Sequence, residues 1–337
     1  MAANIRDVAR LAGVSAGTVS RVIHNQGYIS RVTKKRVQEA IHKLDYYPNA
    51  VASRLALGKT HIIGLLAPNF QELYYIEITD AIIAAARKAG YSVLVNTTQG
   101  DSSHLPEFLR NGNMDGLLVI TPYYVEDVLA GYLKRDLPCV MLNYAAESQV
   151  FSSVYCDQFR VGYLATQHLI DLGHRRIGFC TSDTSSPSPM KRLQGCLQAL
   201  TDAKLAVNGS DIRDMSQKQQ KDPVAEIRAW IREGDLPTAM FVFSDDIALY
   251  VMDALKDAGK RIPQDVSVIG CGNLLFSKRT IPPLTTVDQH TYEMGNKSME
   301  ILLHAIEAET PTPPKIHVIE PRVILRESCR AASSSES

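Results

Sequence analysis

The 337-residue sequence lacks an apolar run long enough to cross a membrane. It also lacks a secretory signal, because Arg6, Asp7 and Arg10 interrupt the amino-terminal segment where an apolar stretch would have to stand. Both absences predict a cytoplasmic protein that does not associate with a membrane.

The usual signatures of catalysis are missing as well. No P-loop or HExxH motif occurs, and no GxSxG nucleophile elbow, because the GxSxG string at 13–17 joins two predicted helices and does not follow a strand. The glycine-rich turn at 270–272 lacks the third glycine of a dinucleotide loop, since Leu275 and Phe276 follow it. His168 and His174 are six residues apart, a poor spacing for metal ligands. We therefore predict no enzyme, no cofactor and no metal, with an enzyme kept as a remote alternative.

The cysteines form no pattern typical of zinc or of a disulfide framework. There are six, with no CxxC pair. Cys139 and Cys180 lie in apolar runs that read as buried strands. We interpret all six as reduced, structural thiols of a cytoplasmic protein.

A net charge of zero conceals a strong asymmetry. The first 60 residues contain ten Lys and Arg against three Asp and Glu, a net of +7. Because the whole chain has 36 of each kind, the remainder holds 26 against 33, a net of −7. A basic end on an acidic body attracts a polyanion with one end only. A solvated basic surface without a partner is the alternative.

Residues 4–25 read as two short helices joined by a tight turn. Asn4 can cap the first helix, Gly13 can end it, and Ser15 can cap the second. In the second helix Val19, Val22 and Ile23 face inward, so that the small and polar side chains and Arg21 face out. Such a face can enter the major groove of DNA, although an ordinary solvated hairpin has the same pattern.

A third helix over 33–44, capped by Ser30, is predicted to bury Val37, Ile41 and Leu44 and to complete a small head. The segment 48–60 then reads as a linker with a short helix that is too weak to stand alone. Leu55 in this linker has no obvious core to join.

From residue 61 onward apolar strands alternate with amphipathic helices, which indicates parallel sheets covered on both faces. The length favours two lobes, with a first break near 156–159 and a ligand cleft at the carboxyl ends of the strands. The adjacent Asp245 and Asp246 suit the capping of a helix start. Strands are predicted over 62–68, 91–97, 116–122, 139–143, 176–182, 238–244 and 266–272. Helices are predicted near 74–90, 103–112, 125–135, 159–172, 190–204, 222–233, 246–258 and 291–307.

Several separated motifs together resemble the LacI/GalR family of bacterial transcription regulators. They are DVARLAGVSAGTVSRVI, YYPNAVASRLA, HLIDLGHRRIGF, RIPQDVSVIG and IPPLTTVDQ, and the similarity runs over essentially the whole chain. The resemblance implies an α/β fold with an all-α helix-turn-helix head and a two-lobed body like a periplasmic binding protein, each lobe a parallel sheet flanked by helices. The implied domains are a head over 1–47, a hinge over 48–60, a body over 61–330 (lobe 1 about 61–157 plus 290–318, lobe 2 about 158–289 plus 319–330) and a disordered tail over 331–337.

The resemblance also implies contacts with operator DNA. Leu55 would be a wedge in the minor groove, where two hinge helices from two subunits kink the duplex. Gly17 either allows a close approach to DNA or is harmless drift. His24 stands where many relatives carry Asn, which puts one phosphate contact in doubt. The implied DNA-binding residues are Asn4, Ser15, Ala16, Gly17, Thr18, Ser20, Arg21, Ser30, Thr33, Tyr46, Asn49, Leu55 and Ala56.

A small-molecule effector is implied between the lobes. The implied contacts are Tyr74, Tyr75, Asp157, Arg192, Asp245, Asn273 and Gln289. Each of these could instead be a structural partner within the fold. The chain departs from the family at Gly272, where most relatives carry an aspartate that holds the ligand.

The resulting expectation is a homodimeric repressor of a carbohydrate-utilisation operon, controlled by a sugar or sugar derivative. The alternative is a purine- or nucleoside-responsive regulator of the same family. A sugar-binding transport protein would share the two-lobed body but should carry an export signal and no basic head.

Overall fold

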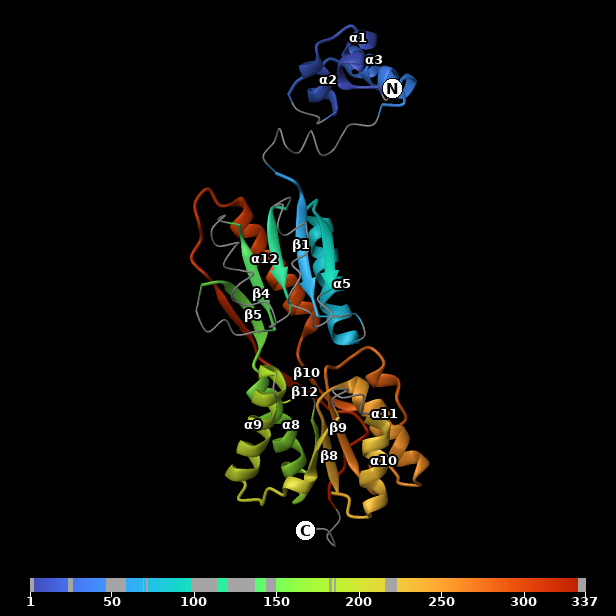
Figure 1. The fold of residues 1–337 in the computed structure, drawn as a ribbon, viewed down its shortest axis with the longest axis vertical. Helices are drawn as coiled ribbons and strands as arrows, with labels where there is room; N and C mark the ends of the chain where they lie inside the picture. Colours follow the sequence, from blue (N-terminus) through green and yellow to red (C-terminus); the bar gives the residue numbers. More distant parts are fainter. Residues whose placement is uncertain are drawn as a thin grey trace. The chain divides into compact units, whose positions relative to one another are not determined.

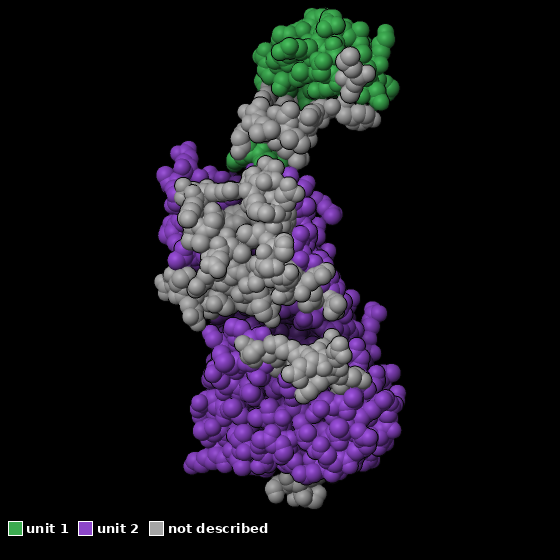
Figure 2. Space-filling view, viewed as in Figure 1, with its two compact units in different colours: residues 1–61 green, residues 62–337 purple. Residues whose placement is uncertain are grey.

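The computed structural model describes residues 3–23, 27–46, 59–68, 70, 72–97, 114–120, 137–143, 150–181, 184, 186–215 and 223–332. The chain forms two compact units, residues 1–61 and residues 62–337 (Figure 2). No helix among the described residues is both long enough and apolar enough to cross a membrane.

The first unit is a bundle of three helices, and the sequence explains where each begins. The side chain of Asn4 accepts hydrogen bonds at the start of the first helix, and Gly13 ends that helix in the left-handed conformation at φ 63°. Val8, Val19 and Val37 are fully buried at the centre. The three helices are α1 (Ile5–Ala12), α2 (Ala16–Ile23) and α3 (Arg31–Lys43).

The third helix differs from the prediction in its start and in its buried face. It begins at Arg31, directly after its cap Ser30, two residues earlier than predicted. Ala40 is buried beside Val37, whereas Ile41 and Leu44 are only half-buried at the edge of the core. The helix faces the core with small side chains, so it packs close to its neighbours.

Arg36 joins the third helix to the turn between the first two. Its guanidinium donates hydrogen bonds to the carbonyl oxygens of Ala12 and Gly13, the latter at 3.3 Å. These carbonyls end α1 and have no partner within that helix. Arg36 therefore holds the turn in place, a role that the sequence pattern did not reveal.

Lobe 1 of the second unit is a six-stranded parallel sheet in the order β11-β5-β4-β3-β1-β2 (Figure 1). Helices α5 (Leu73–Lys88) and α12 (Thr291–Glu307) pack against each other and against the strands. The strands are β1 (Ile62–Ala67), β2 (Ser92–Thr97), β3 (Gly116–Val119), β4 (Cys139–Leu142), β5 (Ser152–Cys156) and β11 (Ile316–Ile319).

Lobe 2 has the order β12-β10-β9-β8-β6-β7, with β12 antiparallel to β10 and the other pairs parallel. Its helices are α8 (Gln158–Asp171), α9 (Pro187–Asp202), α10 (Pro223–Glu233) and α11 (Asp245–Asp257). Its strands are β6 (Ile177–Thr181), β7 (Ile212–Asp214), β8 (Ala239–Val242), β9 (Ser267–Cys271), β10 (Thr285–Asp288) and β12 (Arg322–Ile324), with short 3-10 turns at Gly209–Asp211 and Ser277–Arg279.

The chain passes between the lobes three times: from β5 to α8, from β10 to α12 and from β11 to β12. The seven predicted strands are present, and Cys139 and Cys180 are buried in β4 and β6 as expected. The prediction missed β5, β7, β10, β11 and β12, all short or with partly exposed residues. The predicted helices at 103–112 and 125–135 lie outside the described residues.

Two glycines set the distance between α8 and α9. A Cβ added to Gly162 would lie 1.9 Å from the carbonyl oxygen of Arg192, and one added to Gly195 would lie 1.9 Å from that of Phe159. The two helices therefore cross with their backbones in contact. This crossing matters for function because α8 carries Gln158 and α9 carries Arg192.

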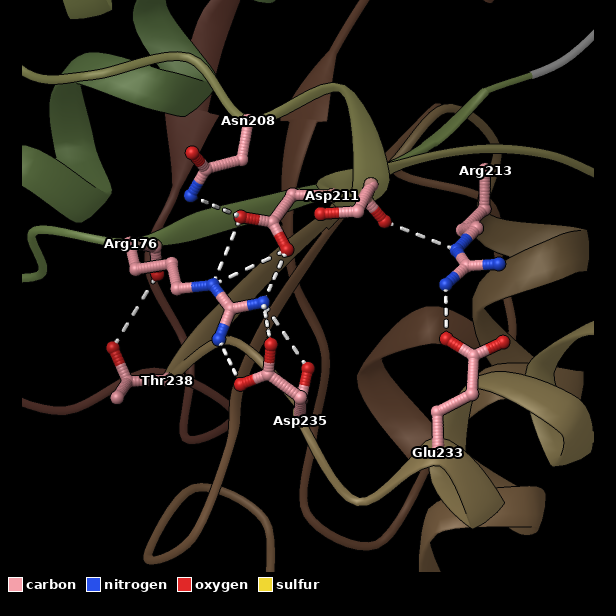
Figure 3. Close-up of polar contacts among 8 residues, drawn as sticks. Arg176, Asn208, Asp211, Arg213, Glu233, Asp235 and Thr238 are labelled. Carbon is pink, nitrogen blue, oxygen red and sulfur yellow. Dashed lines mark hydrogen bonds and ion pairs between the residues drawn. The ribbon is translucent and has the colours of Figure 1, made fainter.

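The far end of lobe 2 is held by ion pairs (Figure 3). Arg176, just before β6, donates to the buried carboxylate of Asp211 at 2.9 Å and to Asp235 at 3.0 Å. Arg213 pairs with Glu233 and lies 5.2 Å from the centre of the Trp230 ring. These contacts join β6, β7 and α10 at one end of the lobe 2 sheet. The inter-lobe region lies at the opposite end of that sheet.

Gly195→Ala should push α8 and α9 apart, because no rotamer change relieves a clash with a backbone carbonyl. We expect a loss of about 2–3 kcal/mol in the free energy of unfolding, measured by denaturant titration. Gly209→Ala is the matched control, since its Cβ would meet no described atom within 4 Å. Equal stability of the two variants would contradict the close crossing.

Candidate functional sites

The exposed face of α2 carries the side chains expected to read DNA. Gly17 and Arg21 are exposed, while Ala16, Thr18 and Ser20 are half-buried. The Arg21 side chain reaches back toward the carbonyl oxygen of Gly17, with 3.5 Å from Nε to the oxygen. The guanidinium therefore lies over a face without bulky side chains, an arrangement that a DNA groove can accept.

Two Ser–Thr pairs mark the starts of α2 and α3. Ser15 Oγ accepts from the Thr18 amide at 3.1 Å, and Ser30 Oγ accepts from the Thr33 amide at 3.2 Å. In each pair the two hydroxyls are 2.9 Å apart. The predicted caps are confirmed. Helix N-termini with amides and hydroxyls are suited to phosphate groups.

The other implied DNA contacts have mixed environments. Asn4 is exposed and caps α1, and Tyr46 is half-buried against the head core. Asn49, Leu55 and Ala56 lie outside the described residues.

Gly17 has no packing reason to be glycine. A Cβ at this position would meet only Ser15 Oγ, at 3.8 Å, an ordinary contact. The head itself would therefore tolerate alanine here, and alanine favours helix by roughly 1 kcal/mol. Any need for glycine must come from something that binds the head.

A buried polar network lies where the two lobes meet, and Arg192 is at its centre. Its Nε donates to Gln158 Oε1 at 3.1 Å, Nη2 donates to the same oxygen, and Nη1 donates to the carbonyl of Phe243. The guanidinium lies 5.6 Å from the centre of the Phe243 ring. Three elements, α8, α9 and the end of β8, thus meet at one side chain.

Amides extend this network into lobe 1. Gln158 Nε2 donates to Gln289 Oε1 at 2.9 Å and to Asn143 Oδ1 at 3.4 Å. The hydroxyl of Tyr74 donates to the same Asn143 oxygen at 3.1 Å, and Gln289 Nε2 donates to Cys271 Sγ at 3.1 Å. Burial raises the pKa of Tyr74, so its hydroxyl stays a donor.

The network joins three of the seven residues implied as effector contacts, Tyr74, Arg192 and Gln289. Tyr75 packs edge-on against Tyr74, with 5.4 Å between ring centres. Gln158 and Asn143 were missed by sequence reasoning. Gln158 follows the implied contact Asp157, and Asn143 is the last residue of the predicted strand 139–143; these positions were the available signals.

Arg192 is buried, with only 8% of its surface exposed, and yet it has no carboxylate partner in the described part of the chain. A buried charge is costly unless hydrogen bonds satisfy it. Here the acceptors are an amide and a backbone carbonyl, both neutral. The site therefore favours a ligand that presents further acceptor atoms to the guanidinium.

The three other implied contacts have partners within lobe 2 or at its border. Asp157 Oδ1 accepts from the Arg160 amide and caps α8. Asn273 Oδ1 accepts from Arg326 at 2.5 Å. Asp245 is fully buried and accepts from Thr286 Oγ1 at 2.7 Å and from the Leu274 amide at 2.9 Å.

The prediction that Asp245 and Asp246 suit the capping of a helix start was wrong as to the cap, although both stand in the first turn of α11. Ser244 is the cap, and its Oγ accepts from the Asp246 amide at 3.1 Å. Asp245 instead fixes the turn after β9, and burial raises the pKa of its carboxyl to about 6. Both oxygens of its carboxyl group accept hydrogen bonds from within the chain.

Acidic side chains from the two lobes face one another. Glu77 of α5 accepts from the Leu275 amide at 3.3 Å and from the Thr291 hydroxyl at 2.9 Å, which ties α5 to the turn after β9. Burial, then the charges of Glu72 and Glu77, raises the pKa of Asp246 to about 6. Ionised Asp246 therefore opposes the approach of the lobes.

Comparisons with known proteins agree with this arrangement. Residues 4–49 match the family described as bacterial regulatory proteins, lacI family, and residues 166–329 match the periplasmic binding protein-like domain. The HTH-type transcriptional repressor PurR of Actinobacillus pleuropneumoniae serotype 3 is 34% identical over 97% of this chain and 98% of its own length.

Two solved structures extend the comparison. The lac repressor dimer bound to operator and the anti-inducer ONPF is 27% identical, with a TM-score of 0.84 over 98% of this chain and 100% of that one. The transcriptional regulator CelR in complex with cellobiose is 29% identical, with a TM-score of 0.70 over 97% of this chain and 99% of that one.

A three-helix head with an open recognition face, on a body with a polar network between two lobes, defines a ligand-responsive DNA-binding protein. The chain belongs to the lacI family of bacterial regulatory proteins. It is a DNA-binding transcriptional regulator. Its relatives are transcriptional repressors and not enzymes, which confirms that prediction.

Asp246→Asn should stabilise the body at neutral pH. Because the folded pKa is raised, the protonated carboxyl is the favourable form, and stability is lost as pH rises from about 4 through about 6. We expect a gain of about 1 kcal/mol at pH 7.5, after allowing for solvent screening, and almost none at pH 4.

Thermal or denaturant unfolding at the two pH values measures this difference. Asp253→Asn, at an exposed position of the same helix, controls for the loss of one charge from α11. A gain of the same size at both pH values would show that Asp246 does not titrate against the opposite lobe.

Proposed function

We propose that this regulator is a homodimeric repressor whose operator affinity is controlled by a purine base or nucleoside bound between the lobes. The observation that carries the effector class is the 34% identity, over 97% of the chain, to repressors named PurR. This choice reverses the order of the two expectations drawn from the sequence, in which a sugar came first.

The chemistry of the inter-lobe network supports a nitrogen heterocycle. An arginine fork matches the adjacent oxygen and nitrogen acceptors of a 6-oxopurine, and amide side chains match the edge of a base. Arg192, Gln158 and Gln289 supply these groups, with Phe243 and Tyr74 as aromatic neighbours. The same groups would hold a ligand to both lobes at once.

Sugar sites, by contrast, depend on carboxylates that accept hydrogen bonds from hydroxyls. Asp245 has both oxygens occupied, Asp157 caps a helix, and Gly272 replaces the family aspartate. A carbohydrate stays the second candidate, because the CelR structure that resembles this chain holds cellobiose.

On the DNA side, we propose that Ala16, Gly17 and Arg21 read bases while Ser15, Thr18, Ser20, Ser30 and Thr33 contact phosphates. The hinge over 48–60, with Leu55 as its wedge, would order on DNA and respond to closure of the lobes. Whether the ligand raises or lowers the affinity for operator DNA depends on which arrangement of the two lobes it binds more tightly.

A thermal-shift panel tests the effector. Hypoxanthine, guanine and their nucleosides should raise the melting temperature of the full chain, whereas ribose and cellobiose at equal concentration should not, because only a bound ligand stabilises the folded state. Arg192→Lys should lose most of the shift, since lysine cannot form the fork. A shift with sugars alone would restore the carbohydrate assignment.

Gly17→Ala and Arg21→Ala test the reading of DNA. Gly17→Ala should leave the head equally or more stable but weaken operator binding about tenfold or more, if DNA approaches the backbone there. Arg21→Ala should relax the preference for one base pair at a cost of about 1–3 kcal/mol.

Fluorescence anisotropy with an operator selected from a random duplex pool measures both, over a salt series. Lys278→Ala, an exposed cation of the body, is the control. Unchanged selectivity in both head variants, or binding that does not weaken with salt, would contradict the proposed reading face.

A further inference from the structure

An unpartnered strand edge and a basic hollow lie together on lobe 1, away from the inter-lobe network. Within the described residues β11 pairs with β5 on one side only and ends the sheet. The backbone bonds fix which groups face outward. Ser153 N–H donates to the Lys315 carbonyl and Asp157 N–H donates to the Ile319 carbonyl.

In a strand of a parallel sheet the backbone groups of successive residues point alternately to the two sides. Since Lys315 and Ile319 point toward β5, Ile316 and Val318 turn their backbone N–H and C=O groups away from β5. Their side chains are 46% and 41% exposed, which is high for apolar residues in a sheet. Such an edge is a template for another strand, and natural proteins usually protect it. No proline or charged residue stands within β11 itself.

Beside this edge, between β11 and α12, lies a hollow of about 340 Å³. Four basic or titratable side chains line it: Lys297 and His304 from α12, and Lys315 and His317 from the β11 segment. Glu300 is the one acid in its lining, so two lysines face a single carboxylate even when both histidines are neutral.

The surroundings of Glu300 show that these cations converge. Lys297 Nζ donates to Glu300 Oε1 at 2.8 Å. The pKa of Glu300 is lowered, chiefly by that hydrogen bond and then by the charges of Lys297, His317 and Lys315. The hollow therefore has a positive field that one glutamate does not cancel.

We propose that β11 and this hollow bind an extended acidic segment of a partner protein by strand addition. The added strand would pair its backbone with Ile316 and Val318. Because side chains alternate along a strand, one face of it would present carboxylates to Lys297 and Lys315, and the other would cover the exposed apolar side chains. The favoured partner sequence alternates acidic and apolar residues.

A fluorescein-labelled peptide of alternating Glu and Val, seven residues long, tests this with the full chain by anisotropy at low salt. The expected result is saturable binding that weakens as salt rises. The matched peptide of alternating Lys and Val should bind at least about tenfold more weakly. Equal binding of the two peptides would overturn the proposal.

Two variants test separately how much the backbone pairing and the lysine charges contribute to peptide binding. Val318→Pro removes one outward N–H while leaving the bonds to β5, and prolines are tolerated on such edges. The Lys297→Ala and Lys315→Ala double variant keeps the strand but removes the field. Each should weaken the peptide about tenfold, whereas Lys278→Ala should not.

Melting temperatures equal to that of the parent chain establish that the variants are folded. If the double variant alone weakens the peptide, and inorganic phosphate competes with it, the hollow is a small-anion site and strand addition is wrong. If neither variant changes the affinity, the peptide binds elsewhere and the proposal fails. Operator binding should stay the same in every variant.

Discussion

The burial of the Arg192 guanidinium, with no carboxylate partner among the described residues, is the constraint on which the inter-lobe region depends. A charge so placed must have acceptors at fixed positions, because an unsatisfied buried donor costs several kcal/mol. Gln158 on α8 reaches Arg192 on α9 because the two helices cross with their backbones in contact, and the Phe243 carbonyl after β8 is the second acceptor. The glycines at that crossing are therefore as important as the polar residues.

The same network ties the two lobes together by neutral groups that a ligand can replace. Gln158 bonds across to Gln289 and Asn143, and Tyr74 completes the chain of contacts. A ligand that supplies better acceptors to Arg192 shifts the balance between lobe arrangements by its difference in affinity for them. Ionised Asp246 opposes closure through the charges of Glu72 and Glu77, whereas Glu77 also ties the lobes together through the Leu275 amide.

Much of the fold was predictable from the sequence, because its signals are local. The caps at Asn4, Ser15 and Ser30 follow from side-chain chemistry next to the amides they serve. The longer apolar strands were readable for the same reason. Edge strands such as β11 were missed because their exposed side chains remove the apolar run that marks a buried strand.

The candidate site was only partly predictable. Family resemblance pointed to Tyr74, Arg192 and Gln289, which the inter-lobe network joins, but it could not show that Asp245 accepts hydrogen bonds from Thr286 and Leu274. Gln158 and Asn143 become visible only when distant elements meet in space, since residues 143 and 289 are far apart in the chain. Contacts of that kind carry no local pattern.

Reciprocity between the two binding sites tests the central claim most directly. If the ligand between the lobes controls the grip on DNA, a purine that changes the operator Kd by some factor must have its own Kd changed by the same factor when operator is bound. We predict equal factors of roughly 5 to 150 for the parent chain and loss of the coupling in Arg192→Lys. An operator affinity that is identical with and without saturating ligand, for purines and sugars alike, would contradict the account.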